Sequence, residues 1–252
     1  MHSDDPFGRI DYRRFVSWEN RIRREMPFLL HLFGDGSKGA RLLDVGCGTG
    51  EHARALSERG FRVIGLDRST GMLDKARGAY PEIPFVRGSM DRLPVRGGGI
   101  LGGAYCLGNT LVNLAEDDGY QRLFRDLRDL LRPGAPLLIQ ILNYRRILEK
   151  EVRHLPLNFR RTDSGNEILF LRVMDRIDER RIRFEVLTLQ RKPPSGETRL
   201  VRTQSSILRP LREEELERFL RDAGFEKIKR FGDYRGSPFV PDSSQDLIVV
   251  AR

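Results

Sequence analysis

The sequence of 252 residues has few cysteines, few histidines and no long apolar run. Its two cysteines, Cys47 and Cys106, are too few for a disulfide framework, which favours a reducing cytosol. Four scattered histidines have no spacing typical of a metal site, so no metal is expected. No apolar run approaches the ~18 residues of a membrane span, and the polar start is unlike a secretory signal. We therefore expect a cytoplasmic protein with no membrane partner.

Lysine is also scarce, since only six of the 45 basic residues are lysines. The formal charge of +9 would suit a nucleic-acid partner, but the arginines are spread along the chain among acidic residues. Nucleic-acid binding needs a contiguous basic patch. We therefore do not expect a nucleic-acid partner.

A short apolar run, Leu42–Val45, is followed by three alternating glycines and then by a helical pattern that starts at Glu51. Glycine is needed where a backbone turns sharply and lies against a ligand without Cβ atoms in the way. The N-terminus of the following helix presents free N–H groups to that ligand. The stretch is therefore typical of a nucleotide-binding loop.

Two nucleotide ligands compete for this loop. A dinucleotide-binding fold has the pattern G-x-G-x-x-G, but its third glycine would fall on Glu51, and Gly50 comes one place early. Asp44, two residues before Gly46, suits a ligand with a cationic amino group. Asp67 ends a second apolar run and can hold ribose hydroxyls. An NAD-dependent oxidoreductase remains the alternative.

Residues 40–143 alternate short apolar runs with amphipathic stretches, which predicts βαβ units and a parallel sheet. We expect strands near 41–45, 62–67, 84–87, 99–106 and 136–142, and helices near 51–59, 70–79 and 117–131. Ligands in such sheets bind beyond the carboxyl ends of the strands. Asp44–Gly50, Asp67, Ser89 with Met90, and Cys106–Asn109 should therefore surround one crevice.

The segments on either side differ from this pattern. A lead-in helix begins near Glu19, and Pro27 predicts a kink or two short helices. Later come β-rich runs at 168–173, 182–189 and 200–207, then a helix at 212–223 and strands at 225–231 and 246–251. The fold class is α/β, a Rossmann-like, mostly parallel seven-stranded sheet with helices on both faces and a small antiparallel β insert. The expected parts are a helical lid (1–35), the cofactor-binding core (36–145), the substrate insert (146–208) and a C-terminal helix with the last strand pair (209–252).

The run Asp44–Gly50, together with Asp67, resembles the first motifs of class I S-adenosylmethionine (SAM) methyltransferases. Within that class, Tyr105–Leu114, Asn143–Leu148 and Phe231–Tyr234 are similar to the glycine/sarcosine N-methyltransferase group and to related bacterial small-molecule N-methyltransferases. The lead-in from Trp18 to Leu29 is similar to their N-terminal lid. The resemblance covers nearly the whole chain and is densest at 40–148. It implies SAM as cofactor and S-adenosylhomocysteine as product.

The resemblance also implies roles for individual residues. Arg21 would bind the SAM carboxylate, Asp67 the ribose, and Met90 would lie against adenine. Asn109 would lie nearest the acceptor, and Asp233, Tyr234 and Tyr12 are candidates for removing its proton. The remaining cofactor-binding candidates are Asp44, Gly46, Cys47, Gly48, Gly50, Arg68, Met72, Ser89, Leu107 and Asn113.

Two positions depart from the group's pattern. A His-Arg pair on the fifth strand, whose arginine binds the substrate carboxylate, is replaced by Ile141 and Leu142. Leucine cannot make a bidentate carboxylate contact, so glycine is not expected as substrate. Ser89 occupies the position of the aspartate that often binds the adenine amino group in this class. We expect a SAM-dependent methyltransferase acting by in-line displacement on a small molecule, with an amine nitrogen as the preferred acceptor. The alternatives are oxygen as acceptor, an RNA or protein methyltransferase, and a SAM-binding regulatory protein; the oligomeric state is left open.

Overall fold

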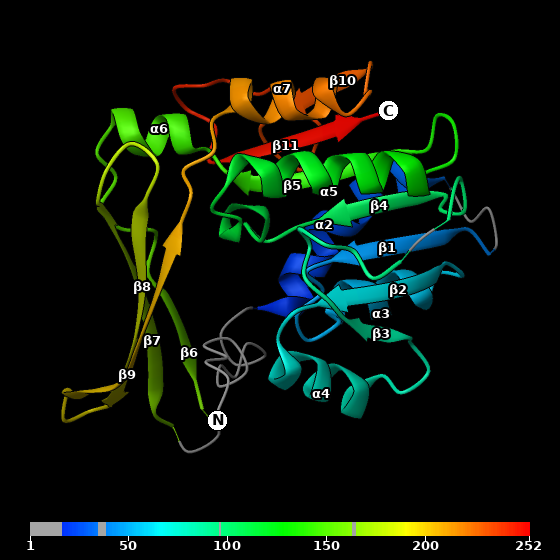
Figure 1. Cartoon of the computed structure of the whole chain (residues 1–252). Coiled ribbons are helices and arrows are strands. Elements are labelled where there is room, and N and C mark those ends of the chain that lie inside the picture. The colour runs from blue at the N-terminus through cyan, green and yellow to red at the C-terminus, as the bar shows by residue number, and fades with distance from the viewer. Residues whose placement is uncertain (1–16, 35–38, 96, 163–164) are drawn as a thin grey trace, which may run out of the picture. The chain divides into compact units, whose positions relative to one another are not determined.

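The computed structural model describes residues 17–34, 39–95, 97–162 and 165–252 (Figure 1). The chain divides into two compact units. The first comprises Met1–Asn143 and Arg212–Arg252, and the second comprises Tyr144–Leu211. Among the described residues, no helix is both long and apolar enough to cross a membrane.

The first unit contains a seven-stranded sheet in the order β10-β11-β5-β4-β1-β2-β3. Its strands are β1 (Arg41–Val45), β2 (Arg62–Asp67), β3 (Phe85–Arg87), β4 (Gly103–Cys106), β5 (Leu137–Leu142), β10 (Ile228–Phe231) and β11 (Asp246–Ala251). Strands β1 to β5 are mutually parallel, whereas β11 runs antiparallel to both β5 and β10. The expected mostly parallel sheet is confirmed. Its strand order reverses between β1 and β4, where ligands of such sheets bind.

Helices cover both faces of this sheet (Figure 1). They are α2 (Trp18–Phe33), α3 (Glu51–Ser57), α4 (Thr70–Ala79), the short 3-10 helix η1 (Leu111–Asn113), α5 (Asp117–Leu130) and α7 (Glu213–Asp222). On one face α5 packs against α7, and the rings of Tyr120 and Phe219 stack with centroids 5.1 Å apart. On the other face α2, α3 and α4 contribute to a single hydrophobic cluster.

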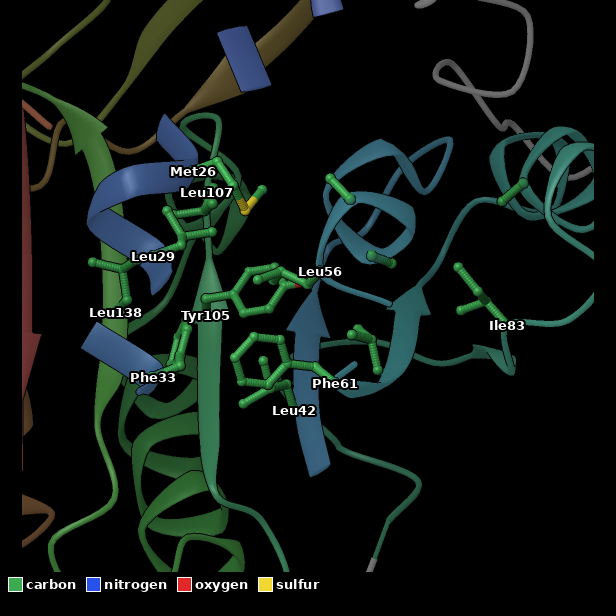
Figure 2. Close-up of a cluster of buried hydrophobic side chains, with 14 of the residues drawn as sticks. Met26, Leu29, Phe33, Leu42, Leu56, Phe61, Ile83, Tyr105, Leu107 and Leu138 are labelled. Carbon is green, nitrogen blue, oxygen red and sulfur yellow. The ribbon is translucent and has the colours of Figure 1, made fainter. Parts of the chain in front are cut away.

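The helix α2 is continuous although Pro27 lies inside it. Met26, Leu29 and Phe33 are buried at helical spacing, and Figure 2 shows Met26 and Leu29 near Leu107. Each buried side chain of this size contributes roughly 1.5–3 kcal/mol. Their sum exceeds the ~3 kcal/mol that an interior proline costs. Packing therefore keeps one helix, where Pro27 had predicted a kink or two short helices.

The second unit is a four-stranded antiparallel sheet, in the order β6-β7-β8-β9, preceded by a short helix. Its elements are α6 (Tyr144–Glu149), β6 (Asn158–Arg161), β7 (Glu167–Arg176), β8 (Ile182–Lys192) and β9 (Glu197–Leu208). The antiparallel insert is confirmed. Its strands are longer than the apolar runs predicted, because pairing with a neighbouring strand extends them into charged residues.

Candidate functional site

The glycine loop after β1 folds over the end of β2. The backbone N–H groups of Gly46 and Cys47 both donate to the carbonyl oxygen of Leu66, at 2.7 and 2.9 Å. The Gly48 N–H donates to Oδ2 of Asp67 at 2.8 Å, and Oδ1 of Asp67 accepts from the Ser69 N–H at 2.9 Å. The structure thus brings together the loop and the carboxylate that the sequence placed nineteen residues further on.

Two glycines of this loop are needed for different reasons. Gly46 has φ +77°, and a Cβ on it would lie 2.2 Å from Cγ2 of Thr110, so it allows close packing against the turn after β4. Gly48 has φ +56°, and no described atom lies within 4 Å of the place where its Cβ would be. Gly48 therefore leaves an open stretch of backbone that a ligand can approach.

Asp44, at the end of β1, is a buried carboxylate that fits a cationic ligand. Its side chain is 3% exposed, and within the described part of the chain its Oδ2 has no hydrogen-bond partner. Burial raises the pKa of Asp44 well above its ordinary value. A buried polar group without a partner is costly, so a ligand that supplies a donor or a positive charge would be stabilised here.

The turn after β4 is fixed by contacts to β5. The Gly108 N–H donates to Oε1 of Gln140 at 2.7 Å, and Nε2 of Gln140 donates to Asp246 at 2.9 Å. Asn109 has φ +64°, and its Oδ1 accepts from the Leu142 N–H at 3.0 Å. This ties Asn109, the residue expected nearest the acceptor, to the carboxyl end of β5.

Three other cofactor candidates surround this turn. Leu107 is buried just before it. Asn113 lies in η1, where its Nδ2 donates to the Thr110 carbonyl at 2.9 Å. Arg21 comes from α2, and a Cβ placed on Gly108 would lie 3.3 Å from its guanidinium. The N-terminal helix therefore brings an arginine to the same edge of the sheet.

The candidates after β2 and β3 differ in exposure. Met72 is buried in α4, and its N–H donates to Oγ of Ser69 at 3.1 Å, whereas Arg68 is exposed. Met90 is half-buried, and the exposed Ser89 donates its hydroxyl proton to the carboxylate of Asp91. A carboxylate therefore lies beside the position where the resemblance has an aspartate.

The candidates for proton removal lie in different surroundings. Asp233 accepts hydrogen bonds from Arg235 and Ser237 in a turn. Burial alone would raise the pKa of Asp233, but these hydrogen bonds outweigh it and lower the pKa. Tyr234 is buried against Phe28 of α2, and burial raises its pKa well above the ordinary value. Tyr12 lies outside the described residues.

Sequence reasoning missed several polar residues at this edge: Glu25, His52, Asp91, Gln140 and Asp246. Glu25 follows Arg21 by four residues, a spacing that places the two on one helix face and could have indicated their contact. Gln140 and Asp246 are 106 residues apart, and no local pattern indicates that they meet.

Comparisons with known proteins agree with this fold and loop. Residues 42–134 match the Methyltransferase domain family. The glycine/sarcosine N-methyltransferase of Parasynechococcus marenigrum is 28% identical over 237 residues, which cover 91% of this chain and 78% of the relative. The malonyl-[acyl-carrier protein] O-methyltransferase of Serratia marcescens is 31% identical over 121 residues, and the match spans only 46% of that relative. SAM-bound CalS10, an amino pentose methyltransferase from Micromonospora echinaspora, superposes with a TM-score of 0.73 at 24% identity, covering 96% of this chain and 94% of that one.

The sheet order and the glycine loop are those of a Rossmann-like, nucleotide-binding core. The family match over residues 42–134 and these relatives support a class I SAM-dependent methyltransferase with SAM as its cofactor.

Proposed function

We propose that this methyltransferase acts on an amine nitrogen of a small molecule and releases S-adenosylhomocysteine. The observation that carries the proposal is the extent of the similarity to the glycine/sarcosine N-methyltransferase, which covers 91% of this chain and so extends well beyond the cofactor-binding core. The structural likeness to an amino pentose methyltransferase supports the fold on which this depends.

Glycine itself does not fit this proposal. Ile141 is fully buried and Leu142 is half-buried at the positions where the N-methyltransferase group has its His-Arg pair. Neither apolar side chain can bind a substrate carboxylate. We therefore expect an amine whose remaining part is apolar or neutral near Leu142.

The residues proposed to hold SAM are those that the glycine loop and its neighbours bring together. Gly48 offers open backbone, Asp67 offers carboxylate oxygens, and Asp44 offers the buried carboxylate without a partner at Oδ2. Arg21 would hold the carboxylate of the methionine moiety. When bound, SAM supplies an electrophilic methyl group on its sulfonium sulfur.

The chain's own contribution to the reaction is orientation. Holding an acceptor nitrogen in line with the carbon that it attacks can lower the barrier by several kcal/mol. An amine must be neutral to attack. Asp233, with its lowered pKa, is a weak base, and Tyr234, with its raised pKa, stays protonated at neutral pH. We therefore propose that the acceptor enters as the free amine.

Oxygen is the second candidate acceptor atom, because 121 residues of this chain are 31% identical to an O-methyltransferase. That match covers only 48% of this chain and 46% of the relative. A reducing compartment such as the cytosol suits the free thiols of Cys47 and Cys106. A small-molecule partner, rather than nucleic acid, follows from the diffuse distribution of charge.

The test is a panel of amines, amino acids and phenols incubated with the enzyme and SAM, with S-adenosylhomocysteine as readout. We expect turnover of neutral amines, including amino sugars, and little turnover of glycine or sarcosine. Turnover of phenols alone would show that the acceptor atom is oxygen and not nitrogen. Binding of NAD but not of SAM would overturn the cofactor assignment.

Asn109→Asp is the matching variant. It keeps an oxygen that can accept from the Leu142 N–H and a residue type that tolerates positive φ, and it replaces the Nδ2 donor by a carboxylate oxygen that can only accept and carries negative charge. We expect kcat/KM for the amine to fall by roughly 10-fold or more with unchanged SAM affinity. Activity equal to that of the unchanged protein would show that the Asn109 amide does not contribute to the acceptor site.

A further inference from the structure

A buried polar cluster joins α2 to α3 beside the glycine loop. Glu25 of α2 is 1% exposed. Its Oε1 accepts from Nε of Arg21 at 2.9 Å, and its Oε2 accepts from Nε2 of His52 at 2.7 Å. Arg24 also reaches Oε1, at 3.4 Å, from a largely exposed position. One carboxylate therefore holds two side chains from different helices.

The protonation of this cluster follows from its contacts. Burial alone would raise the pKa of Glu25, but the hydrogen bond from His52 and the charge of Arg21 outweigh it and lower the pKa to about 2. Burial lowers the pKa of His52. At neutral pH Glu25 is ionised and His52 is neutral. Because a carboxylate oxygen can only accept, the imidazole carries its proton on Nε2.

The same cluster fixes where the Arg21 guanidinium lies. Its central carbon lies 5.1 Å from the centroid of the Trp18 ring. The Trp18 and His52 rings are nearly perpendicular, with their centroids 5.5 Å apart. Two nitrogens of the guanidinium would come within 3.3 and 3.5 Å of a Cβ on Gly108, in the turn before Asn109. The guanidinium is thus held between the Trp18 ring and the crevice.

We propose that Glu25 and His52 are positioning residues that hold the Arg21 guanidinium at the turn after β4, ready to bind the carboxylate of the cofactor's methionine moiety. The inference rests on the proposed role of Arg21. An arginine side chain without such contacts samples many rotamers. Ordering this side chain when the ligand binds costs conformational entropy and therefore lowers the affinity. A guanidinium held in advance by a buried carboxylate avoids that loss.

The competing explanation is that the cluster only joins α2 to α3. A buried ion pair is weak support for net stability, but losing Glu25 would still loosen that packing. Such loosening would weaken every ligand of the crevice alike. Positioning of Arg21 affects only ligands that carry the carboxylate, so the two explanations predict different ligand profiles.

The experiment compares two ligands by calorimetry on the full chain. S-adenosylhomocysteine has the methionine-derived carboxylate, whereas 5′-methylthioadenosine has the nucleoside and sulfur without it. We expect Glu25→Ala to raise the dissociation constant of S-adenosylhomocysteine by roughly 10-fold or more and that of 5′-methylthioadenosine by less than about 2-fold. Glu25→Gln should show a smaller effect of the same kind, because its amide oxygen still accepts from Arg21. It also keeps the test open if the alanine variant does not fold.

Glu19→Gln is the matched control. Glu19 forms the same type of i,i+4 ion pair on α2, with Arg23 at 2.7 Å, but both side chains are exposed. Glu19→Gln should leave the affinity for both ligands unchanged. Equal weakening of both ligands by Glu25→Ala, or no weakening, would overturn the positioning role.

Arg21→Met separates this inference from the proposed function. If Arg21→Met selectively weakens S-adenosylhomocysteine and the Glu25 variants do not, the positioning role is wrong and the proposed function stands. If Arg21→Met leaves S-adenosylhomocysteine unaffected, Arg21 does not hold the carboxylate and the inference fails with it. Failure of the unchanged protein to bind SAM would contradict the proposed function itself.

Discussion

The open backbone at Gly48 leads to a prediction in which strain and ligand contact can be separated. Gly48→Ala adds one methyl group at a position with φ +56° and no described atom within 4 Å. The methyl meets no protein atom there, so its cost to the free protein is the left-handed backbone conformation alone. That conformation costs roughly 1–2 kcal/mol for a residue with a Cβ. For a chain of this size the melting temperature should fall by about 2–8 °C.

Gly99→Ala is the matched control. Gly99 has φ +60° with nothing within 4 Å, and it lies before β4, away from the carboxyl edge of the sheet. Both variants should lose similar stability in thermal unfolding without ligand. Only Gly48→Ala puts a methyl group where SAM is proposed to lie against the backbone. Overpacking of that kind costs typically 1–3 kcal/mol, which is about 5- to 150-fold in dissociation constant.

The assay is titration calorimetry with SAM and S-adenosylhomocysteine at a temperature where both variants are folded. We expect Gly99→Ala to bind like the unchanged protein and Gly48→Ala to bind more weakly by the stated factor. A folded Gly48→Ala protein with unchanged affinity would show that the cofactor does not approach this backbone, and the assignment of the loop would be refuted.

Three further outcomes are expected. Asp67→Ala removes the acceptor of the Gly48 N–H and should weaken SAM by about 1–3 kcal/mol in calorimetry; unchanged affinity would exclude Asp67 from the site. Leu142→Arg should shift the substrate panel toward amines with a carboxylate while SAM affinity stays the same, and an unaltered panel would contradict the proposed acceptor side. The folded-state pKa of His52 is lowered, so the unfolded chain binds more protons than the folded chain below about pH 6.5. The free energy of unfolding should therefore decrease as the pH is lowered through this range. Denaturant unfolding of His52→Gln should show a flatter pH dependence, and an equally steep one would assign the slope to other groups.

Much of the fold follows from local pattern. The strands β1, β2 and β11 have the predicted ends because their apolar runs are bounded by charged residues or glycine. The strand β4 was expected from residue 99 but begins at Gly103. Glycines at 97–99 with positive φ at two positions prevent an earlier start. The strand β6 was not predicted, because Asn158–Arg161 lacks apolar alternation and is extended only through its pairing with β7.

The candidate site shows the same limit. The contact of Gly48 with Asp67 joins two motifs that each have a recognisable sequence pattern, so it could be anticipated. The contact of Gln140 with Asp246 depends on the register of β5 against β11, which is set by tertiary pairing. The contact of Arg21 with Glu25 was missed although their i,i+4 spacing could have indicated it, whereas the contribution of His52 depends on how α2 packs on α3.

Charge decides between the two ligands that a glycine loop alone leaves open. The chain carries a formal charge of +9, yet the side chains around this loop include Asp44, Glu51 and Asp67, and the latter two raise the pKa of Asp44 further after burial has done so. A pyrophosphate would add negative charge to a group of acids of which two are buried and one is half-buried, and in a medium of low dielectric that repulsion is large. A sulfonium nucleoside with an amino group supplies the opposite charge to the same carboxylates. The loop geometry is therefore shared with dinucleotide-binding folds, and we propose that the acidic residues around it favour the cationic cofactor.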